Sequence, residues 1–243
     1  MKAFTTTLSL AAILMLAPSV WAHYTWLVRT HYNAAGTQAV LELGHGHHFP
    51  LSEEAPGAKY LKVYLETPKG PQEIEAKSAG KALKLEAPLA DRGLKRVYYV
   101  RDRGVISQTA AGWKDGGKDQ HPGAKASMKS IQYGIAWIGF TGTTNSSKAL
   151  GLDLELNYEK GMKGRRVRAF RKGKPARDLE IIAVLGEDNE KSLGKTDKEG
   201  YVIADSLPTG KPVLFTVRVE EQAPKGSNYD KNVLSCSLSL PAE

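Results

Sequence analysis

Short runs in which apolar and polar residues alternate recur along almost the whole chain, and long helical periodicity is nearly absent. The runs are rich in Val, Ile, Leu, Tyr and Thr, and clusters of Gly, Pro, Asn and Asp separate them, which is typical of an all-β chain. Their number fits two β-sandwich domains better than one. The strands expected from this pattern are Tyr24–Arg29, Thr37–Leu43, Tyr60–Glu66, Lys95–Val100, Ile131–Ile138, Leu152–Tyr158, Arg166–Arg171, Leu179–Val184, Tyr201–Ala204, Pro212–Val219 and Val233–Leu240.

A polar break within 141–150, with the sequence Thr-Gly-Thr-Thr-Asn-Ser-Ser, divides this series of strands. We therefore expect an N-terminal β domain over 23–145 and a C-terminal β-sandwich over 146–243. In the second part, turn-then-strand segments such as Gly173-Lys174-Pro175 and Thr196–Tyr201 resemble the immunoglobulin-like modules of many secreted proteins. That resemblance implies an immunoglobulin-like fold for the C-terminal domain and carries no chemistry.

The first 22 residues have the pattern of a secretory signal peptide. Lys2 gives the charged start, Leu8–Leu16 the apolar stretch, and Val20-Trp21-Ala22 a small-x-small cleavage site. The apolar stretch is shorter than the roughly 18–20 residues of a membrane-spanning helix. We expect cleavage after Ala22, a signal-peptide segment of 1–22 and a periplasmic or secreted mature protein.

The net charge of +8 raises the question of a nucleic-acid partner. An exported protein rarely meets nucleic acid, and the main basic run lacks the interleaved aromatic residues on which single-stranded bases stack. We expect no nucleic-acid partner and interpret the run as a solvated hairpin, with weak attraction to an anionic membrane surface as the alternative. The run consists of Lys160, Lys163, Arg165, Arg166, Arg168, Arg171, Lys172, Lys174 and Arg177.

Cleavage after Ala22 would make His23 the first residue of the mature protein. Its α-amine would then lie beside its own imidazole, and these groups titrate near pH 8 and near pH 6.5, respectively. A modest fall in either pKa lets both nitrogens bind a metal ion at neutral pH, so His23 is a candidate bidentate chelator. The alternative is that the cut falls before a histidine that merely starts a strand.

All six histidines lie before residue 146, and three of them crowd into the segment Gly44-His45-Gly46-His47-His48-Phe49-Pro50. In an extended chain His45 and His47 point to one side and His48 to the other. With the two nitrogens of His23, two imidazoles make four. A nearly planar set of four nitrogens suits Ni(II) or Cu(II), and a tetrahedral one suits Zn(II). The alternative is a polar loop with solvated histidines.

The remaining candidates carry weaker signals. His121 lies in a long Gly-rich segment and is a candidate extra ligand from a loop that closes over the site, or a surface residue. His31 follows the first expected strand and is interpreted as part of a surface turn. Trp26 and Trp113 are expected to be core or lid residues rather than a platform for a substrate.

Conventional catalytic motifs are missing from the sequence. It contains no Gly-x-Ser-x-Gly elbow, phosphate-binding Gly loop or His-Glu-x-x-His helix. The one cysteine, Cys236, alternates with apolar residues in a strand-like run, so we expect a buried, inert thiol. The adjacent Glu53 and Glu54 are interpreted as solvated loop carboxylates. The pattern does not favour an enzyme.

Three segments resemble a family of exported periplasmic proteins associated with nickel and cobalt uptake, of the NikM-like, domain-of-unknown-function type. They are Ala22-His23-Tyr24-Thr25-Trp26-Leu27, the Gly44–Pro50 segment, and Thr109-Ala110-Ala111-Gly112-Trp113-Lys114. The Gly-Lys-Pro and Thr-Asp-x-x-Gly-aromatic turns of the second part are similar as well. The resemblance implies two β-sandwiches and capture of a transition-metal ion for a transporter. His23 and His47 match the family's histidine positions, whereas His45 and His48 fall at its variable positions.

The leading hypothesis is therefore a periplasmic metal-binding protein for Ni(II) or Co(II), with Cu(II) as a further option, which delivers the ion to a membrane uptake transporter. Its candidate ligands are His23, His45, His47, His48 and His121. One alternative is a copper enzyme with a terminal-histidine brace, and the other is a structural β-sandwich protein with an incidental histidine cluster.

Overall fold

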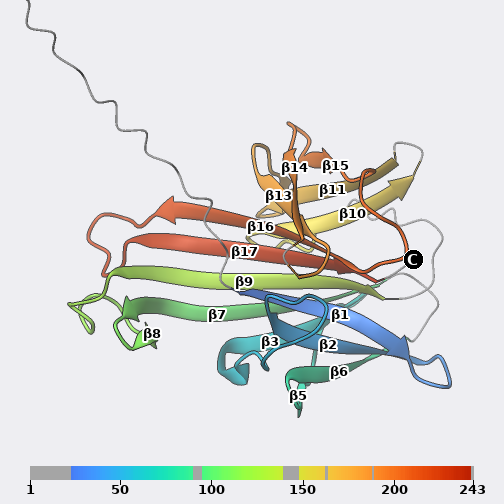
Figure 1. Ribbon diagram of the computed structural model, residues 1–243, viewed down its shortest axis with the longest axis horizontal. Helices are drawn as coiled ribbons and strands as arrows, with labels where there is room; N and C mark the ends of the chain where they lie inside the picture. Colours follow the sequence, from blue (N-terminus) through green and yellow to red (C-terminus); the bar gives the residue numbers. More distant parts are fainter. Residues whose placement is uncertain (1–22, 90–94, 139–147, 162–163, 188, 242–243) are drawn as a thin grey trace, which may run out of the picture.

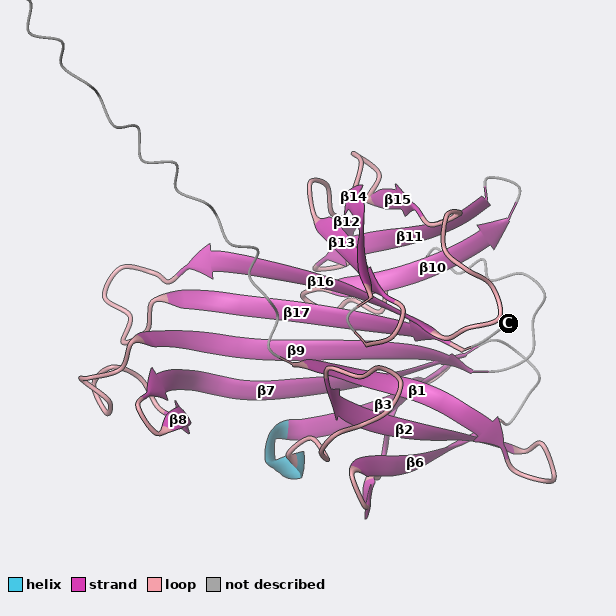
Figure 2. Cartoon of the chain, in the orientation of Figure 1, coloured by secondary structure: helices cyan, strands magenta, loops and turns pink. Residues whose placement is uncertain are grey.

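A computed structural model describes residues 23–89, 95–138, 148–161, 164–187 and 189–241 (Figure 1). The described chain is nearly all strand, as Figure 2 shows, which confirms the predicted all-β class. No helix in these ranges is long and apolar enough to cross a membrane. The elements are β1 (Tyr24–Tyr32), β2 (Gln38–Gly46), the short 3-10 helix η1 (Ala58–Tyr60), β3 (Leu61–Thr67), β4 (Gly70–Ile74), β5 (Lys77–Ala79), β6 (Ala82–Pro88), β7 (Lys95–Thr109), β8 (Gly112–Asp115), β9 (Ala126–Ile138), β10 (Glu155–Gly161), β11 (Gly164–Arg171), β12 (Lys174–Pro175), β13 (Glu180–Val184), β14 (Glu190–Lys195), β15 (Tyr201–Ile203), β16 (Val213–Gln222) and β17 (Lys231–Leu240).

One large sheet forms the middle of the molecule. Its nine strands follow the order β14-β13-β16-β17-β9-β7-β3-β4, with β8 paired to β7. A second sheet has the order β1-β2-β6-β5, and a third joins β10, β11 and β12, with β15 on β11. In Figure 1 the second sheet lies along one side of the large sheet and the third along the other.

The two smaller sheets pack on opposite faces of the large one, and neighbouring residues of β7 show this directly. Tyr99 belongs to the hydrophobic core formed with β1, β2 and β6, whereas Tyr98 belongs to the core formed with β10 and β11. Successive side chains of a strand point to opposite faces. The large sheet is therefore buried on both faces over much of its area, which explains the length of its apolar strands.

Hydrogen bonding crosses the predicted domain boundary. β9 precedes residue 146 and β17 follows it, and the two strands pair in parallel from Lys231↔Met128 to Ser239↔Ala136. The break itself lies largely at 139–147, outside the described residues. The two parts of the chain thus share a sheet, and the division at 145/146 stays a prediction.

Each expected strand overlaps an observed one, but several observed strands have no counterpart in the prediction. β7 and β9 run well beyond the expected 95–100 and 131–138. The strands β4, β5, β6, β8, β12 and β14 were not expected, because most are short or highly exposed and depend on a neighbouring strand. The basic run begins near the end of β10 and continues along β11, and these two strands pair antiparallel, so the expected hairpin is present.

Two further expectations concern single residues. Cys236 is a free cysteine that is 1% exposed, in the core that includes residues of β10, which confirms its expected burial; burial raises the pKa of its thiol. His31 lies inside β1 rather than past its end, next to a register shift between Arg29 and His31, and it is exposed.

Candidate metal site at the start of β1

The antiparallel pairing of β1 and β2 brings the N-terminal histidine to the histidine cluster. The register pairs Tyr24 with Gly46 and Thr25 with His45. His23 precedes β1 and His47 follows β2, so the two residues continue this ladder at the same end. The ring centroids of His23 and His47 are 4.3 Å apart. The His23 ring also stacks on that of His45, at 5.1 Å and an interplanar angle of 15°.

The chain after His47 folds back onto the site because its apolar residue is buried. Phe49 is 2% exposed and packs edge-on against Trp26, with ring centroids 5.6 Å apart. The returning segment is fastened to β2, since the Glu53 backbone N–H donates to the His45 carbonyl at 3.0 Å. Ser52 Oγ accepts from the His45 N–H at 2.9 Å. The loop therefore delivers Glu53 to the histidines.

The two glycines of the segment make room for this arrangement. A Cβ at Gly44 would lie 2.7 Å from the indole nitrogen of Trp26, and one at Gly46 would lie 2.7 Å from the carboxyl carbon of Glu53. Gly46 also has a φ of 141°, which residues with a side chain rarely adopt. A residue larger than glycine at position 46 would displace the Glu53 side chain from the site.

His23, His47 and Glu53 form the group best suited to hold a metal ion in the described part of the chain. One ligand atom from each lies within 4.8 Å of the others. The His47 side chain is 46% exposed and that of Glu53 is 33% exposed. Two imidazoles and one carboxylate can bind Ni(II), Co(II), Zn(II) or Cu(II).

Glu53 is held in the ionised state that a metal ligand needs. The backbone N–H of His47 donates to Glu53 Oε1 at 2.9 Å, and this hydrogen bond is the main cause of the lowered pKa of the carboxyl group. The imidazoles of His47 and His48 lower this pKa further. Their nitrogens lie 3.5 Å and 3.3 Å from the carboxylate oxygens.

His45 lies beside this group and not within it. Its Nδ1 is 2.8 Å from Thr25 Oγ1, and its Nε2 is 3.6 Å from a carboxylate oxygen of Glu54. Burial, followed by the charges of Arg101 and His23, lowers the pKa of His45 to about 4. His45 is thus a neutral, hydrogen-bonded ring at neutral pH, and it supports the ring of His23.

His48 connects the loop to the second part of the chain. Its Nδ1 faces Glu53 Oε1, and its Nε2 lies 2.9 Å from Oε1 of Glu187 in the β13–β14 connection. Both ring nitrogens therefore face carboxylates. This arrangement orients Glu53 and leaves His48 outside the group of three ligands.

His121 lies elsewhere in the molecule. It belongs to the loop between β8 and β9, at the far left end of the large sheet in Figure 1. Its Nε2 is 2.8 Å from the Asp115 carbonyl oxygen, and its backbone N–H donates to the Gly117 carbonyl. The structure does not bring it to the other histidines. Of the two tryptophans considered above, Trp26 is fully buried and Trp113 is 40% exposed on β8.

Comparison with known proteins supplies a family without a function. A family described as Domain of unknown function (DUF4198) matches residues 20–218. The chain belongs to this family. No curated protein matches the sequence. The match includes His23, His47 and Glu53.

Glu53 is the site residue that the sequence did not reveal. Its pairing with Glu54 on a polar loop is typical of solvated carboxylates. The sequence feature that could have indicated it is Phe49, an apolar residue between the histidines and Glu53 in a short polar segment. A buried apolar side chain in a short loop makes the chain fold back on itself. Glu53 then lies close to the histidine that precedes it by six positions.

Proposed function

We propose that the protein captures a transition-metal ion at His23, His47 and Glu53 and hands it to an uptake transporter. The observation that carries this proposal is the convergence of three ligand atoms within 4.8 Å. They come from the start of β1, the end of β2 and the returning loop. The buried Phe49 holds the loop so that Glu53 lies beside the two histidines. This fixed arrangement supports a bound ion better than a chance contact between surface residues would.

Removal of the leader would add a fourth ligand atom. Cleavage after Ala22 makes the backbone nitrogen of His23 an α-amine, which can bind the same ion as the His23 imidazole. Three nitrogens and one carboxylate oxygen suit Ni(II), Co(II) and Cu(II). The resemblance to nickel- and cobalt-uptake proteins favours the first two, and the predicted leader favours a periplasmic or secreted location.

The openness of the site supports a carrier role over a structural one. Structural metal sites are closed off by the protein, whereas exchange requires a side of the ion that a partner can reach. His23 is exposed, and about half of the His47 side chain is accessible to solvent. A transporter can therefore approach the ion from solution.

The proposal is tested by calorimetric titration of NiCl2 and CoCl2 into protein that begins at His23, compared with protein that carries one extra glycine before it. We expect one ion per chain and at least tenfold weaker binding in the extended form, because the extra residue converts the amine to an amide. Equal affinities would remove the amine from the site. Lack of binding to either form would favour a structural β-sandwich protein. Peroxide-driven oxidation of a polysaccharide by the copper-loaded protein would favour a histidine-brace enzyme instead.

A further inference from the structure

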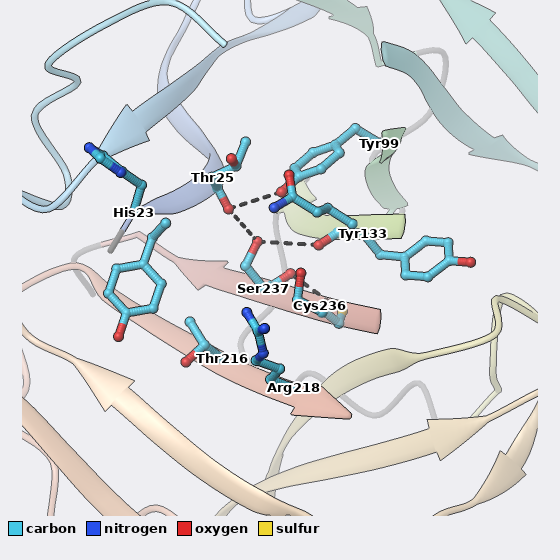
Figure 3. A pocket seen from close by; sticks show the side chains of 11 residues that line it. His23, Thr25, Tyr99, Tyr133, Thr216, Arg218, Cys236 and Ser237 are labelled. Atoms are coloured by element: carbon cyan, nitrogen blue, oxygen red, sulfur yellow. Dashed lines mark hydrogen bonds between the residues drawn. The ribbon is translucent and has the colours of Figure 1, made fainter. Parts of the chain in front are cut away.

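A small polar pocket adjoins the candidate metal site. Its volume is about 60 Å³, and it lies between the start of β1 and the face of the large sheet formed by β9, β17 and β16 (Figure 3). His23 belongs to its wall, so the pocket and the metal site share a residue. The other lining residues are Tyr24, Thr25, Tyr99, Gln132, Tyr133, Thr216, Arg218, Ser235, Cys236 and Ser237.

The floor of the pocket belongs to a row of polar residues that crosses the sheet. Arg218 pairs with Ser235, Ser235 with Gln132, and Gln132 with Arg101. These residues lie two positions from Thr216, Ser237, Gly134 and Tyr99, so they share the face on which β1 packs. An arginine stands at each end of this row.

The lining contains no carboxylate, and one of its buried hydroxyls is unsatisfied. The hydroxyls of Tyr99 and Ser237 already donate to the Thr25 carbonyl, at 2.9 Å and 2.8 Å. Thr216 is 1% exposed, and its Oγ1 has no hydrogen-bond partner among the described residues. Outside the lining, the buried Nε of Arg101, at the end of the polar row, likewise has no partner among them. The Oε1 of Gln132 accepts from Arg101 Nη1 at 3.2 Å, which directs the acceptor end of this amide to Arg101. A buried hydroxyl without a partner is costly, so Thr216, in a lining without a carboxylate, favours a ligand that accepts its hydrogen bond.

Arg218 supplies positive charge at the pocket. Its side chain extends from β16 toward Ser237 in Figure 3. Its Nε donates to Glu220 Oε1 at 2.8 Å, and Glu220 also pairs with Lys231 at 2.6 Å. Arg218 Nη2 donates to the same oxygen, and Glu220 is not a lining residue, so the carboxylate that orients the guanidinium lies outside the pocket.

We propose that this pocket binds the carboxylate group of a small ligand that accompanies the metal ion. A volume of about 60 Å³ suits a group as small as a carboxylate better than a whole sugar or nucleotide. The metal part rests on the proposed function: Glu53 is the one carboxylate of the three ligands, so a divalent ion bound there keeps one positive charge, while Glu54 and Glu187 face His45 and His48. A carboxylate beside His23 would neutralise that charge. It is either a free acid or one arm of a metal chelate.

The first experiment uses no metal. Labelled formate (¹³C) is titrated by NMR into the protein that begins at His23. We expect saturable millimolar binding that weakens at least fivefold in both Thr216→Val and Arg218→Gln. Thr216→Val retains the side-chain shape and removes the hydroxyl, and circular dichroism verifies that each variant is folded.

Arg171→Gln is the matched control. Arg171 is 25% exposed and pairs with Glu221, as Arg218 is 32% exposed and pairs with Glu220, but Arg171 is not part of this pocket. Its formate affinity should equal that of the wild type. Binding that does not saturate, or that Arg171→Gln weakens as much as Arg218→Gln does, would overturn the proposal.

The second experiment adds the metal. Formate should strengthen NiCl2 binding at least threefold in the wild type and have no effect in Arg218→Gln, while the affinities without formate agree within twofold. An unchanged nickel affinity in the wild type would overturn the link to the metal. Failure to bind nickel at all would refute the proposed function, whereas the formate titration would still decide the pocket.

Native mass spectrometry of the protein mixed with nickel citrate and formate separates the two sources of the carboxylate. A complex of protein, nickel and citrate assigns the group to a chelate. A complex of protein and nickel that retains formate but not citrate assigns it to a free acid.

Discussion

Two clusters of ionisable side chains differ in how completely their members are paired. Arg96 is 1% exposed and holds both Glu66 oxygens, at 2.7 Å and 2.8 Å, together with Glu155, Asn157 and the Lys148 carbonyl. The other cluster, His23, His47 and Glu53, is open to solvent. Here the His47 ring nitrogen Nδ1 lies 3.5 Å from Glu53 Oε2, which is a longer and weaker contact than those of Arg96.

This difference in pairing distinguishes a cluster that stabilises the fold from one that can accept a ligand. A buried arginine whose donors all meet acceptors fixes the packing of β10 against the large sheet and has no capacity for a ligand. The histidine cluster contains donor atoms that are close together and weakly paired. Its carboxylate is kept ionised, and its exposed side allows an ion to enter.

The largest effect should follow from removal of Arg96. Arg96→Ala leaves Glu155, which is fully buried, without its cationic partner, so the free energy of unfolding should fall by about 3–5 kcal/mol. Urea unfolding measures this. Arg177→Ala, at a pair whose arginine side chain is 72% exposed, is the control and should cost less than about 1 kcal/mol. If Arg96→Ala lowered the free energy of unfolding by less than about 1 kcal/mol, the structural role of the Arg96 cluster would be contradicted.

Acid should destabilise the protein through His45. Its pKa is about 4 in the folded state and about 6.5 when unfolded, so the unfolded chain binds more protons between these values. The contribution of His45 is fully present above pH 6.5 and is lost as the pH falls to 4, by about 3 kcal/mol in total. Unfolding curves of the metal-free protein from pH 7 to pH 4 measure it. His45→Asn keeps a hydrogen-bonding group for Thr25 Oγ1 but cannot titrate, so this part of the pH dependence should vanish. An identical pH profile in both proteins would show that His45 does not cause it.

Loss of His47 should weaken nickel binding strongly. Removal of a residue that merely orients a ligand costs about 10–100-fold in metal affinity, so His47→Ala should cost at least about 100-fold. Calorimetry with NiCl2 measures the change, and the free energy of unfolding of the metal-free protein should stay within about 0.5 kcal/mol, as for other exposed positions. His31→Ala, an exposed histidine on β1, should bind nickel as the wild type does.

Glu53→Gln should have a smaller effect, about tenfold on nickel affinity, because the amide keeps an oxygen and loses the charge. Glu54→Gln is its neighbouring control. Glu54 faces His45 and lies outside the group of three ligands, so it should change the affinity less than about threefold. Equal losses in both variants would indicate a general effect of negative charge.

The sequence predicted what depends on local pattern and left out what depends on distant contacts. The alternation of apolar and polar residues located most of the long strands. The sequence also predicted that His23 and His47 share a site, and the β1–β2 pairing brings their rings to 4.3 Å. The role of Glu53 depends on a loop anchored by Phe49 on Trp26. The contact of His48 with Glu187 depends on a segment about 140 positions away. The shared β9–β17 pair likewise joins parts that sequence composition separates.

A crystal structure of the protein that begins at His23, grown with one equivalent of NiCl2, tests the central claim most directly. The account predicts an ion bound by the imidazoles of His23 and His47, the carboxylate of Glu53 and the α-amine of His23, at about 2.0–2.2 Å from each. An ion held instead between His48 and Glu187, or at His121, would contradict it.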